Sequence, residues 1–188
     1  INMATEQGVR VRGSDELETL HTVPTMVRAA QLMGEAVREV YRLDGPSLEA
    51  QSGEFSVSIL MGGQVGNGEL RLFQIYSAGN YIEATEDTPY LQIGEHKYGK
   101  PIIDRALTYE TPLDDGLKLA LISMDSTMRS NLSVGMPIDL MVYRRAALKV
   151  ALQRRIKDDD DYFLGLRRSW PDALTHAYRT FPRPGSSS

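Results

Sequence analysis

Apolar residues recur at helical spacing in the first long segment of the chain, from Thr22 to about Leu43. Charged residues fill the intervening positions, and Pro24 suits the first turn of a helix. Asp44-Gly45-Pro46 predicts where this helix ends. The apolar face of the predicted amphipathic helix consists of Met26, Ala29, Ala30, Met33, Ala36, Val37, Val40 and Tyr41.

The period changes to that of a β-strand over Phe55 to Met61, where every second residue is apolar and faces the same side. Gly62-Gly63 and the glycines after it predict a turn. The return strand is predicted over Leu70 to Ser77, and the next strand over Tyr81 to Thr85. A fourth short strand is predicted over Tyr90 to Ile93.

Two helices are predicted next, over about Lys97 to Leu107 and from Leu113 or Asp114 to about Arg129. The second carries apolar residues on most sides and is therefore expected to be buried on most sides. Ile138 to Tyr143 and Leu148 to Ile156 have the pattern of a hairpin around Arg144-Arg145-Ala146-Ala147.

The last predicted helix begins near Asp160 or Asp161 and continues to about Phe181. Pro171 lies inside it and predicts a kink or two helical pieces. The chain thus alternates blocks of hairpin-linked strands with blocks of helices. This order predicts the α+β class, with antiparallel sheets covered by helices.

The two ends of the chain differ from its middle. Ile1 to Gly8 has the pattern of the last turns of a helix that a glycine stops, and a natural domain seldom begins with an uncapped helix. We therefore expect a segment of the protein before Ile1. Pro182 to Ser188 is polar and rich in proline and serine, so we predict a single domain over residues 1–181 and a disordered tail after it.

Composition narrows the function classes. The hydrophobic content of 41% and the charged content of 24% are typical of a globular protein, and the net charge of -4 gives no basic surface for nucleic acid. No apolar run approaches the roughly 20 residues that span a membrane. The chain has no cysteine, which removes thiolate catalysis and agrees with a location in the reducing cytoplasm. Its three histidines lack the spacing of metal ligands, so we expect no metal and no cofactor.

Three segments resemble one family of proteins. Phe55 to Gln64 (FSVSILMGGQ), Leu91 to Gly99 (LQIGEHKYG) and Asp125 to Gly135 (DSTMRSNLSVG) are similar to the central hairpin, the glycine turn and the helix end of proteasome β-subunits. The stretches IGEHKYGKPIIDRAL and DSTMRSNLSVGMPIDLMVY resemble the bacterial branch called Anbu, the ancestral β-subunit. The resemblance covers Thr22 to Phe181. It implies the N-terminal-nucleophile hydrolase fold, an αββα four-layer sandwich of antiparallel sheets, with the first strands missing before Ile1.

The resemblance also implies a reaction. In this family an N-terminal Thr or Ser attacks a peptide carbonyl with its hydroxyl, and its own α-amine takes the proton. An α-amine has a reference pKa of about 8, so it acts as a base near neutral pH. A Lys from an early strand assists with its positive charge. These groups would all precede Ile1, so we expect a threonine-type peptidase subunit whose residues 1–188 are inactive alone.

Three residues match the positions of the family's supporting catalytic groups. Ser133 matches the loop serine that hydrogen-bonds near the amine of the nucleophile. Ser130 stands where closed proteasomes usually carry Asp. Glu95 falls near the position in the glycine turn where the family carries another serine. These two replacements imply either retuned catalysis or a weakened site, because a hydroxyl cannot supply the negative charge of an aspartate. Without the resemblance, serines beside Asn131 after a helix are typical of caps and turns.

The combined prediction is a subunit of a cytoplasmic, homo-oligomeric, proteasome-like hydrolase that acts on peptides or proteins. The resemblance implies a ring-like or open helical assembly, with the helix after Thr22 and the two helices after Lys97 between neighbouring copies. Two alternatives remain open. One is a non-catalytic assembly subunit of the same fold, and the other is an N-terminal-nucleophile amidohydrolase that acts on a small amide.

Overall fold

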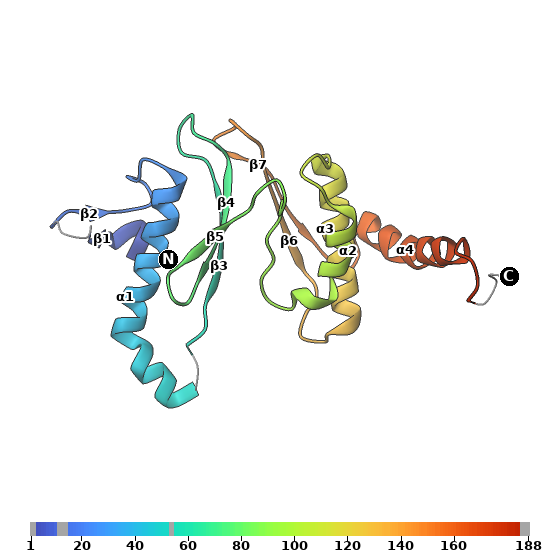
Figure 1. Cartoon of the computed structure of the whole chain (residues 1–188), viewed down its shortest axis with the longest axis horizontal. Coiled ribbons are helices and arrows are strands. Elements are labelled where there is room, and N and C mark those ends of the chain that lie inside the picture. The colour runs from blue at the N-terminus through green and yellow to red at the C-terminus, as the bar shows by residue number, and fades with distance from the viewer. Residues whose placement is uncertain (1–2, 11–14, 53–54, 185–188) are drawn as a thin grey trace. The chain divides into compact units, whose positions relative to one another are not determined.

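The computed structural model in Figure 1 describes residues 3–10, 15–52 and 55–184. The chain divides into two compact units, each of which is described by itself below. The first unit comprises residues 1–93 and 142–151, and the second comprises residues 94–141 and 152–188. The single domain over residues 1–181 stays a prediction. Of the predicted tail, residues 185–188 lie outside the described residues, and 182–184 have no regular structure beyond a turn.

The first unit contains one long helix packed against a three-stranded antiparallel sheet. Helix α1 (Met26–Ser52) contacts β4 (Arg71–Tyr76) and β5 (Tyr81–Glu83), and β4 pairs with β3 (Ser58–Gly63) on its other side. The predicted apolar face of the helix supplies most of the core, as its spacing indicates. The core residues from helix and sheet are Met26, Ala29, Ala30, Leu32, Met33, Ala36, Val37, Phe73 and Ile75.

Two glycines allow α1 to touch the turn between β4 and β5. A Cβ atom on Gly34 would overlap the carbonyl oxygen of Gly79 and would lie 3.0 Å from its carbonyl carbon. Gly79 has a φ of +74°, a conformation that glycine adopts without strain. Arg38 Nη1 donates to the Gly79 carbonyl at 3.0 Å. The main chains of helix and turn are therefore in direct contact.

The predicted end of this helix is wrong, since α1 continues through Pro46 to Ser52. Proline cannot donate a hydrogen bond to the carbonyl four residues earlier, and its presence inside a helix costs about 3 kcal/mol. Just before the proline, the ring of Tyr41 covers the main chain of Gly45, where a Cβ would lie 2.7 Å from Tyr41 Cε2. Tyr41 also packs on Phe55, with ring centroids 5.2 Å apart.

The residues before α1 form a short helix and two very short strands. The π-helix Met3–Gln7 ends at Gly8, which has a φ of +79°, so the predicted helix end is confirmed for the described residues. Strands β1 (Val9–Arg10) and β2 (Leu17–Glu18) pair antiparallel. Arg28 on α1 connects β2 to the helix, because it binds both Glu35 and Glu18. These two hydrogen bonds raise the pKa of the Arg28 guanidinium above its ordinary value.

Three of the four predicted strands in this unit are confirmed, with shifted ends. β3 begins at Ser58 and includes Gly62 and Gly63, which were predicted to form the turn. The predicted strand over residues 90–93 is wrong, because this segment has no regular secondary structure and belongs to none of the sheets of the described residues. Its residues have strand propensity, but propensity alone does not place a segment in a sheet.

The second unit is mainly helical. Helix α3 (Leu113–Ser130) packs against a 3-10 turn (His96–Tyr98), α2 (Lys100–Ala106) and α4 (Asp161–Arg179). The prediction that α3 is buried on most sides is wrong for its first half. Leu113 is 45% exposed, and the buried positions begin at Leu121, because only the second half has neighbours on several sides.

Helix α4 begins at a side-chain cap, where the Asp160 carboxylate accepts from the Phe163 amide at 3.0 Å. The helix continues through Pro171, so the prediction of two helical pieces is wrong. Pro171 leaves the Arg167 carbonyl without its helical donor, but Arg129 of α3 donates to that carbonyl at 3.3 Å. A donor from another helix thus satisfies the group that proline leaves free.

The strands of the described residues form three separate sheets. One of them is the predicted hairpin, confirmed as β6 (Ile138–Tyr143) and β7 (Val150–Ile156); the other two are the three-stranded sheet and the β1–β2 pair. The α+β class is therefore confirmed, whereas the described residues do not show a complete four-layer sandwich. None of the described helices has the length and the apolar character needed to cross a membrane.

Candidate functional site

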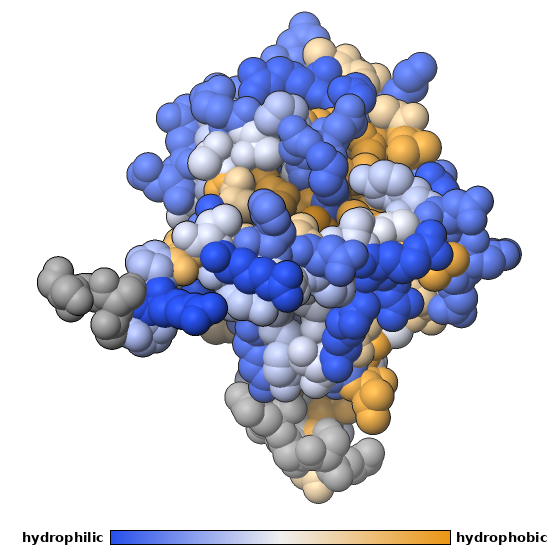
Figure 2. Space-filling model, turned by 90° about the vertical axis from the view of Figure 1, so that its right-hand side faces the viewer, coloured by the Kyte–Doolittle hydropathy of each residue, from blue (hydrophilic) through white to orange (hydrophobic). Residues whose placement is uncertain are grey.

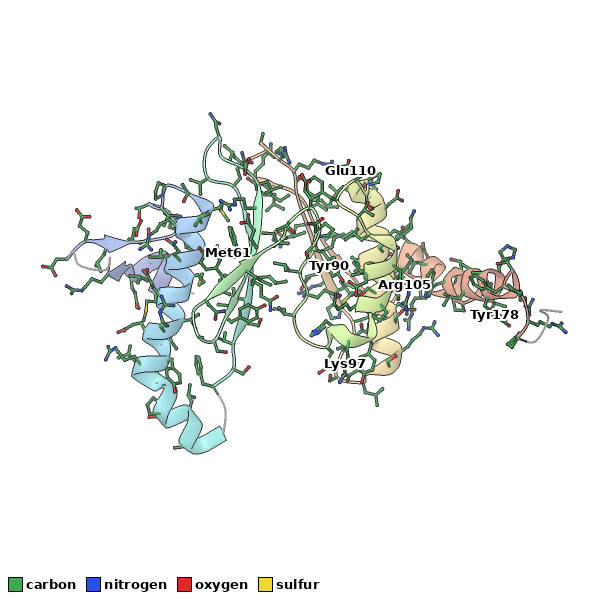
Figure 3. All side chains as sticks on the ribbon, viewed as in Figure 1. Met61, Tyr90, Lys97, Arg105, Glu110 and Tyr178 are labelled. Carbon is green, nitrogen blue, oxygen red and sulfur yellow. The ribbon has the colours of Figure 1, made fainter. Side chains whose placement is uncertain are left out.

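The first predicted supporting residue, Glu95, lies in a tight turn at the start of the second unit. Gly94 has a φ of +77°, which reverses the chain before the 3-10 turn His96–Tyr98. The Glu95 carboxylate is exposed and lies 4.0 Å from Lys97 Nζ, so it faces solvent and a cation. Figure 3 labels Lys97 at this turn.

The glycine turn is fixed to the second half of α3 by Gly99. A Cβ atom on Gly99 would overlap Ser123 Oγ and would lie 2.7 Å from the Ser123 carbonyl oxygen and 2.9 Å from Thr127 Oγ1. Thr127 Oγ1 in turn donates to the Ser123 carbonyl at 2.9 Å. Only a residue without a side chain fits this position, so Gly99 brings the turn against the helix that ends in Ser130.

The other two predicted supporting residues lie at the C-terminal end of α3. Ser130 is the last residue of the helix, and both it and Ser133 are exposed. Asn131 Oδ1 accepts from the Ser133 amide at 2.9 Å and from Ser133 Oγ at 2.8 Å. The Asn131 amide continues the helical pattern by donating to the Thr127 carbonyl at 2.9 Å. The loop after α3 is therefore held by its own hydrogen bonds.

The structure brings the three predicted residues into the same unit, but within residues 3–10, 15–52 and 55–184 no hydrogen bond or ion pair joins any two of them. The turn made by Asn131 and Ser133 is the arrangement typical of polar residues after a helix. A serine in such a turn still offers its oxygen lone pairs as acceptors. The supporting role of Ser130, Ser133 and Glu95 stays a prediction.

One charged residue of this region was not singled out from the sequence. Asp125 is fully buried in α3. Arg129 Nε donates to its Oδ2 at 3.0 Å, and Arg167 Nε of α4 lies 2.7 Å from its Oδ1. The spacing of Asp125 and Arg129 is the only sequence signal, because residues four apart on a helix lie on the same face. The burial and the contact with α4 depend on the tertiary structure.

A groove of about 540 Å³ runs between α3 and α4. Lys118 and Asp161 supply charge at its edge, and the hydrogen bond to Asp115 raises the pKa of the Lys118 amine. Its floor is mainly apolar and includes Ile122, Leu166 and Trp170. In the part of the chain that the structure describes, no three His, Asp or Glu side chains gather where they could hold a metal ion.

Solved structures of known proteins are similar to this chain over nearly its whole length. Anbu from Hyphomicrobium sp. strain MC1 is 48% identical, with a TM-score of 0.81, over 92% of this chain and 70% of that chain. Anbu (ancestral beta-subunit) from Yersinia bercovieri is 47% identical, with a TM-score of 0.83, over 94% of this chain and 72% of that chain. The chain in the helical assembly of the Anbu complex from Pseudomonas aeruginosa is 45% identical, with a TM-score of 0.82, over 94% of this chain and 72% of that chain. Neither a family model nor a curated protein matches the chain.

Proposed function

Because the chain belongs to the Anbu family of proteasome-like β-subunits, we propose that it is a subunit of a homo-oligomeric peptidase with an N-terminal nucleophile. The similarity to Anbu over 92% of the chain carries this proposal. The chain spans about 70% of the length of the relatives, so the remaining part of the family fold is proposed to complete the four-layer sandwich.

The proposed reaction divides its groups between this chain and residues outside it. A Thr or Ser at the processed N-terminus would attack the peptide carbonyl, and its α-amine would act as the base. Within this chain, the Ser133 hydroxyl would accept a hydrogen bond from that amine, since its oxygen keeps free lone pairs while its proton binds Asn131. The loop after α3 thus contributes orientation, not a second nucleophile.

Ser130 and Glu95 make the proposed site electrostatically unlike that of a closed proteasome. Ser130 carries no charge, and the exposed Glu95 lies near Lys97, which screens its carboxylate. An amine without a nearby buried carboxylate has less help in holding the proton that it takes from the hydroxyl. We therefore propose a slower peptidase and not a fast general protease.

The proposal is tested with the protein as its gene encodes it. Intact mass and N-terminal sequencing are expected to find Thr or Ser as the first residue of the mature protein. A panel of fluorogenic peptides and one small acyl-amide is then expected to show turnover of peptides that disappears when the first residue is replaced by Ala. Turnover of the acyl-amide alone would favour the small-amide hydrolase. A mature N-terminus without a hydroxyl, together with no turnover, would favour the non-catalytic assembly subunit.

Homo-oligomeric assembly in the bacterial cytoplasm is part of the same proposal. A solved relative from Pseudomonas aeruginosa forms a helical assembly. In this chain the second half of α4 carries Leu174 and Tyr178, which are 49% and 61% exposed. Figure 3 shows Tyr178 at the end of α4 that lies away from α3, and Figure 2 shows hydrophobic residues in orange at the surface among hydrophilic ones in blue. Apolar side chains in a row on one helix favour an interface.

An antiparallel contact between two copies of α4 fits its charges. Asp161 begins the helix, and Arg179 ends it. Antiparallel packing would place Arg179 of one copy beside Asp161 of the other and would set the exposed Tyr178 opposite the exposed Tyr162. The helices α1, α2 and α3, which the sequence predicted between neighbours, stay predictions as further contact surfaces.

Leu174→Glu is expected to weaken this assembly, because it places a charge within the proposed contact. Light scattering on the protein as its gene encodes it should show a smaller mass at the same concentration. Leu132→Glu is the matched control, because Leu132 is equally apolar, is 102% exposed and lies outside α4. Equal masses for both variants and the wild type would exclude α4 as an interface.

A further inference from the structure

Asp125 forms its ion pairs inside the protein and not at the exposed surface. The carboxylate is completely buried: its Oδ2 accepts from Arg129 Nε of its own helix, and its Oδ1 lies 2.7 Å from Arg167 Nε of α4 as an ion pair, without the geometry of a hydrogen bond. A buried ion pair contributes little net stability compared with apolar residues of the same size. One documented effect of such pairs is that they select a single arrangement of the packed elements.

A second contact links the same two helices. Pro171 leaves the Arg167 carbonyl free, and Arg129 Nη2 donates to it at 3.3 Å. Arg129 therefore binds Asp125 through Nε and the main chain of α4 through Nη2. Since Arg167 contacts Asp125 with its side chain and Arg129 with its carbonyl, the three residues form a closed cycle between α3 and α4.

The loop that carries Ser133 begins directly after this cycle. Arg129 is followed by Ser130 and Asn131, and the Asn131 amide is bonded to the Thr127 carbonyl. Asn131 then holds both the amide and the hydroxyl of Ser133. A rotation of the last turn of α3 would carry this whole set of bonds with it.

We propose that Asp125 is a positioning residue for the active site. It fixes the last turns of α3 against α4, and in this way it orients the loop 131–135 and the Ser133 hydroxyl. The effect on catalysis rests on the proposed peptidase function. The effect on the order of the loop 131–135 is independent of that function.

The test replaces the pair by apolar residues of similar size, Asp125→Leu with Arg167→Met, in the protein as its gene encodes it. Met at position 167 can still cover Phe163, whose ring centroid lies 5.7 Å from the Arg167 guanidinium. The melting temperature is expected to stay near that of the wild type. Hydrogen exchange of the Asn131, Ser133 and Val134 amides, all bonded in the loop, is expected to become at least about tenfold faster.

Peptide turnover supplies the second readout. kcat is expected to fall on the order of tenfold to a hundredfold with KM unchanged, because a displacement of about 1 Å at an active site costs on the order of 10²-fold. The control is Asp139→Leu with Arg155→Met, an ion pair of the same kind and distance, 2.7 Å, whose side chains are 65% and 59% exposed. This control should change neither exchange nor kcat.

Loop exchange and kcat equal to those of the control would overturn the proposal. If the double variant does not fold, Asp125→Asn keeps the shape and removes the charge, and unchanged loop exchange in that variant would overturn it equally. A wild type without peptidase activity would refute the proposed function, while the exchange measurement would still decide whether Asp125 orders the loop.

Discussion

Gly34→Ala is expected to lower the free energy of unfolding of the first unit by about 3 kcal/mol, because it forces two main chains apart. The added methyl group would overlap the carbonyl oxygen of Gly79, which belongs to a rigid turn and not to a flexible side chain. Separation of helix and turn would also break the bond from Arg38 to the Gly79 carbonyl. Denaturant unfolding of residues 1–188 followed by circular dichroism measures the change.

Gly165→Ala is the matched control for this experiment. Gly165 also lies inside a helix, α4, but a Cβ atom there would meet nothing within 4 Å. Alanine is favoured over glycine in a helix by about 1 kcal/mol, so this variant is expected to be slightly more stable than the wild type. If Gly34→Ala is stabilised to the same extent, the close contact between α1 and the turn is wrong.

The sequence alone predicts elements whose cause is local. The helix after Thr22, the hairpin of β3 and β4 and the start of α4 near Asp160 follow from spacing and from single residues beside them. Pro46 indicates a helix end by a local rule, and that prediction was wrong; Pro171 indicates a kink or two helical pieces by the same rule, and of these the two pieces were wrong. At Pro171 the donor that replaces the lost helical bond comes from another helix, and no local pattern connects that donor to the proline.

Pro171 shows this limit most clearly. The donor that compensates for it is Arg129, which is 42 positions earlier in the sequence and belongs to another helix. The candidate site likewise depends on contacts between helices that are far apart in the sequence. Ser130 and Ser133 were found through a resemblance of short segments, whereas Asp125 was missed, because its burial depends on the packing of α3 against α4.

The division into two units and the prediction of a single domain make different claims about unfolding. If the two units unfold separately, the unfolding transition of each unit shifts only when its own core is changed. A single domain over residues 1–181 would unfold as one, whichever core is damaged. Trp170 is the only tryptophan of the chain and lies in the second unit, so its fluorescence follows that unit alone.

Phe163→Ala is expected to destabilise the second unit by about 3–5 kcal/mol, the usual cost of removing a buried phenylalanine side chain. Phe163 is 1% exposed and packs in the cluster with Leu121 and Ile156. Its backbone amide also donates to the Asp160 carboxylate that caps α4. The Trp170 fluorescence transition should therefore move to lower denaturant in this variant.

Comparison with Gly34→Ala then decides between one domain and two. If the single-domain prediction holds, Gly34→Ala moves the Trp170 transition as far as it moves the circular dichroism transition, because damage in either core unfolds the whole chain. If the units unfold separately, Gly34→Ala leaves the Trp170 transition where it is in the wild type, and only Phe163→Ala moves it. The second outcome would also mean that the loop carrying Ser133 keeps its structure without the first unit, because that loop and Trp170 belong to the same unit.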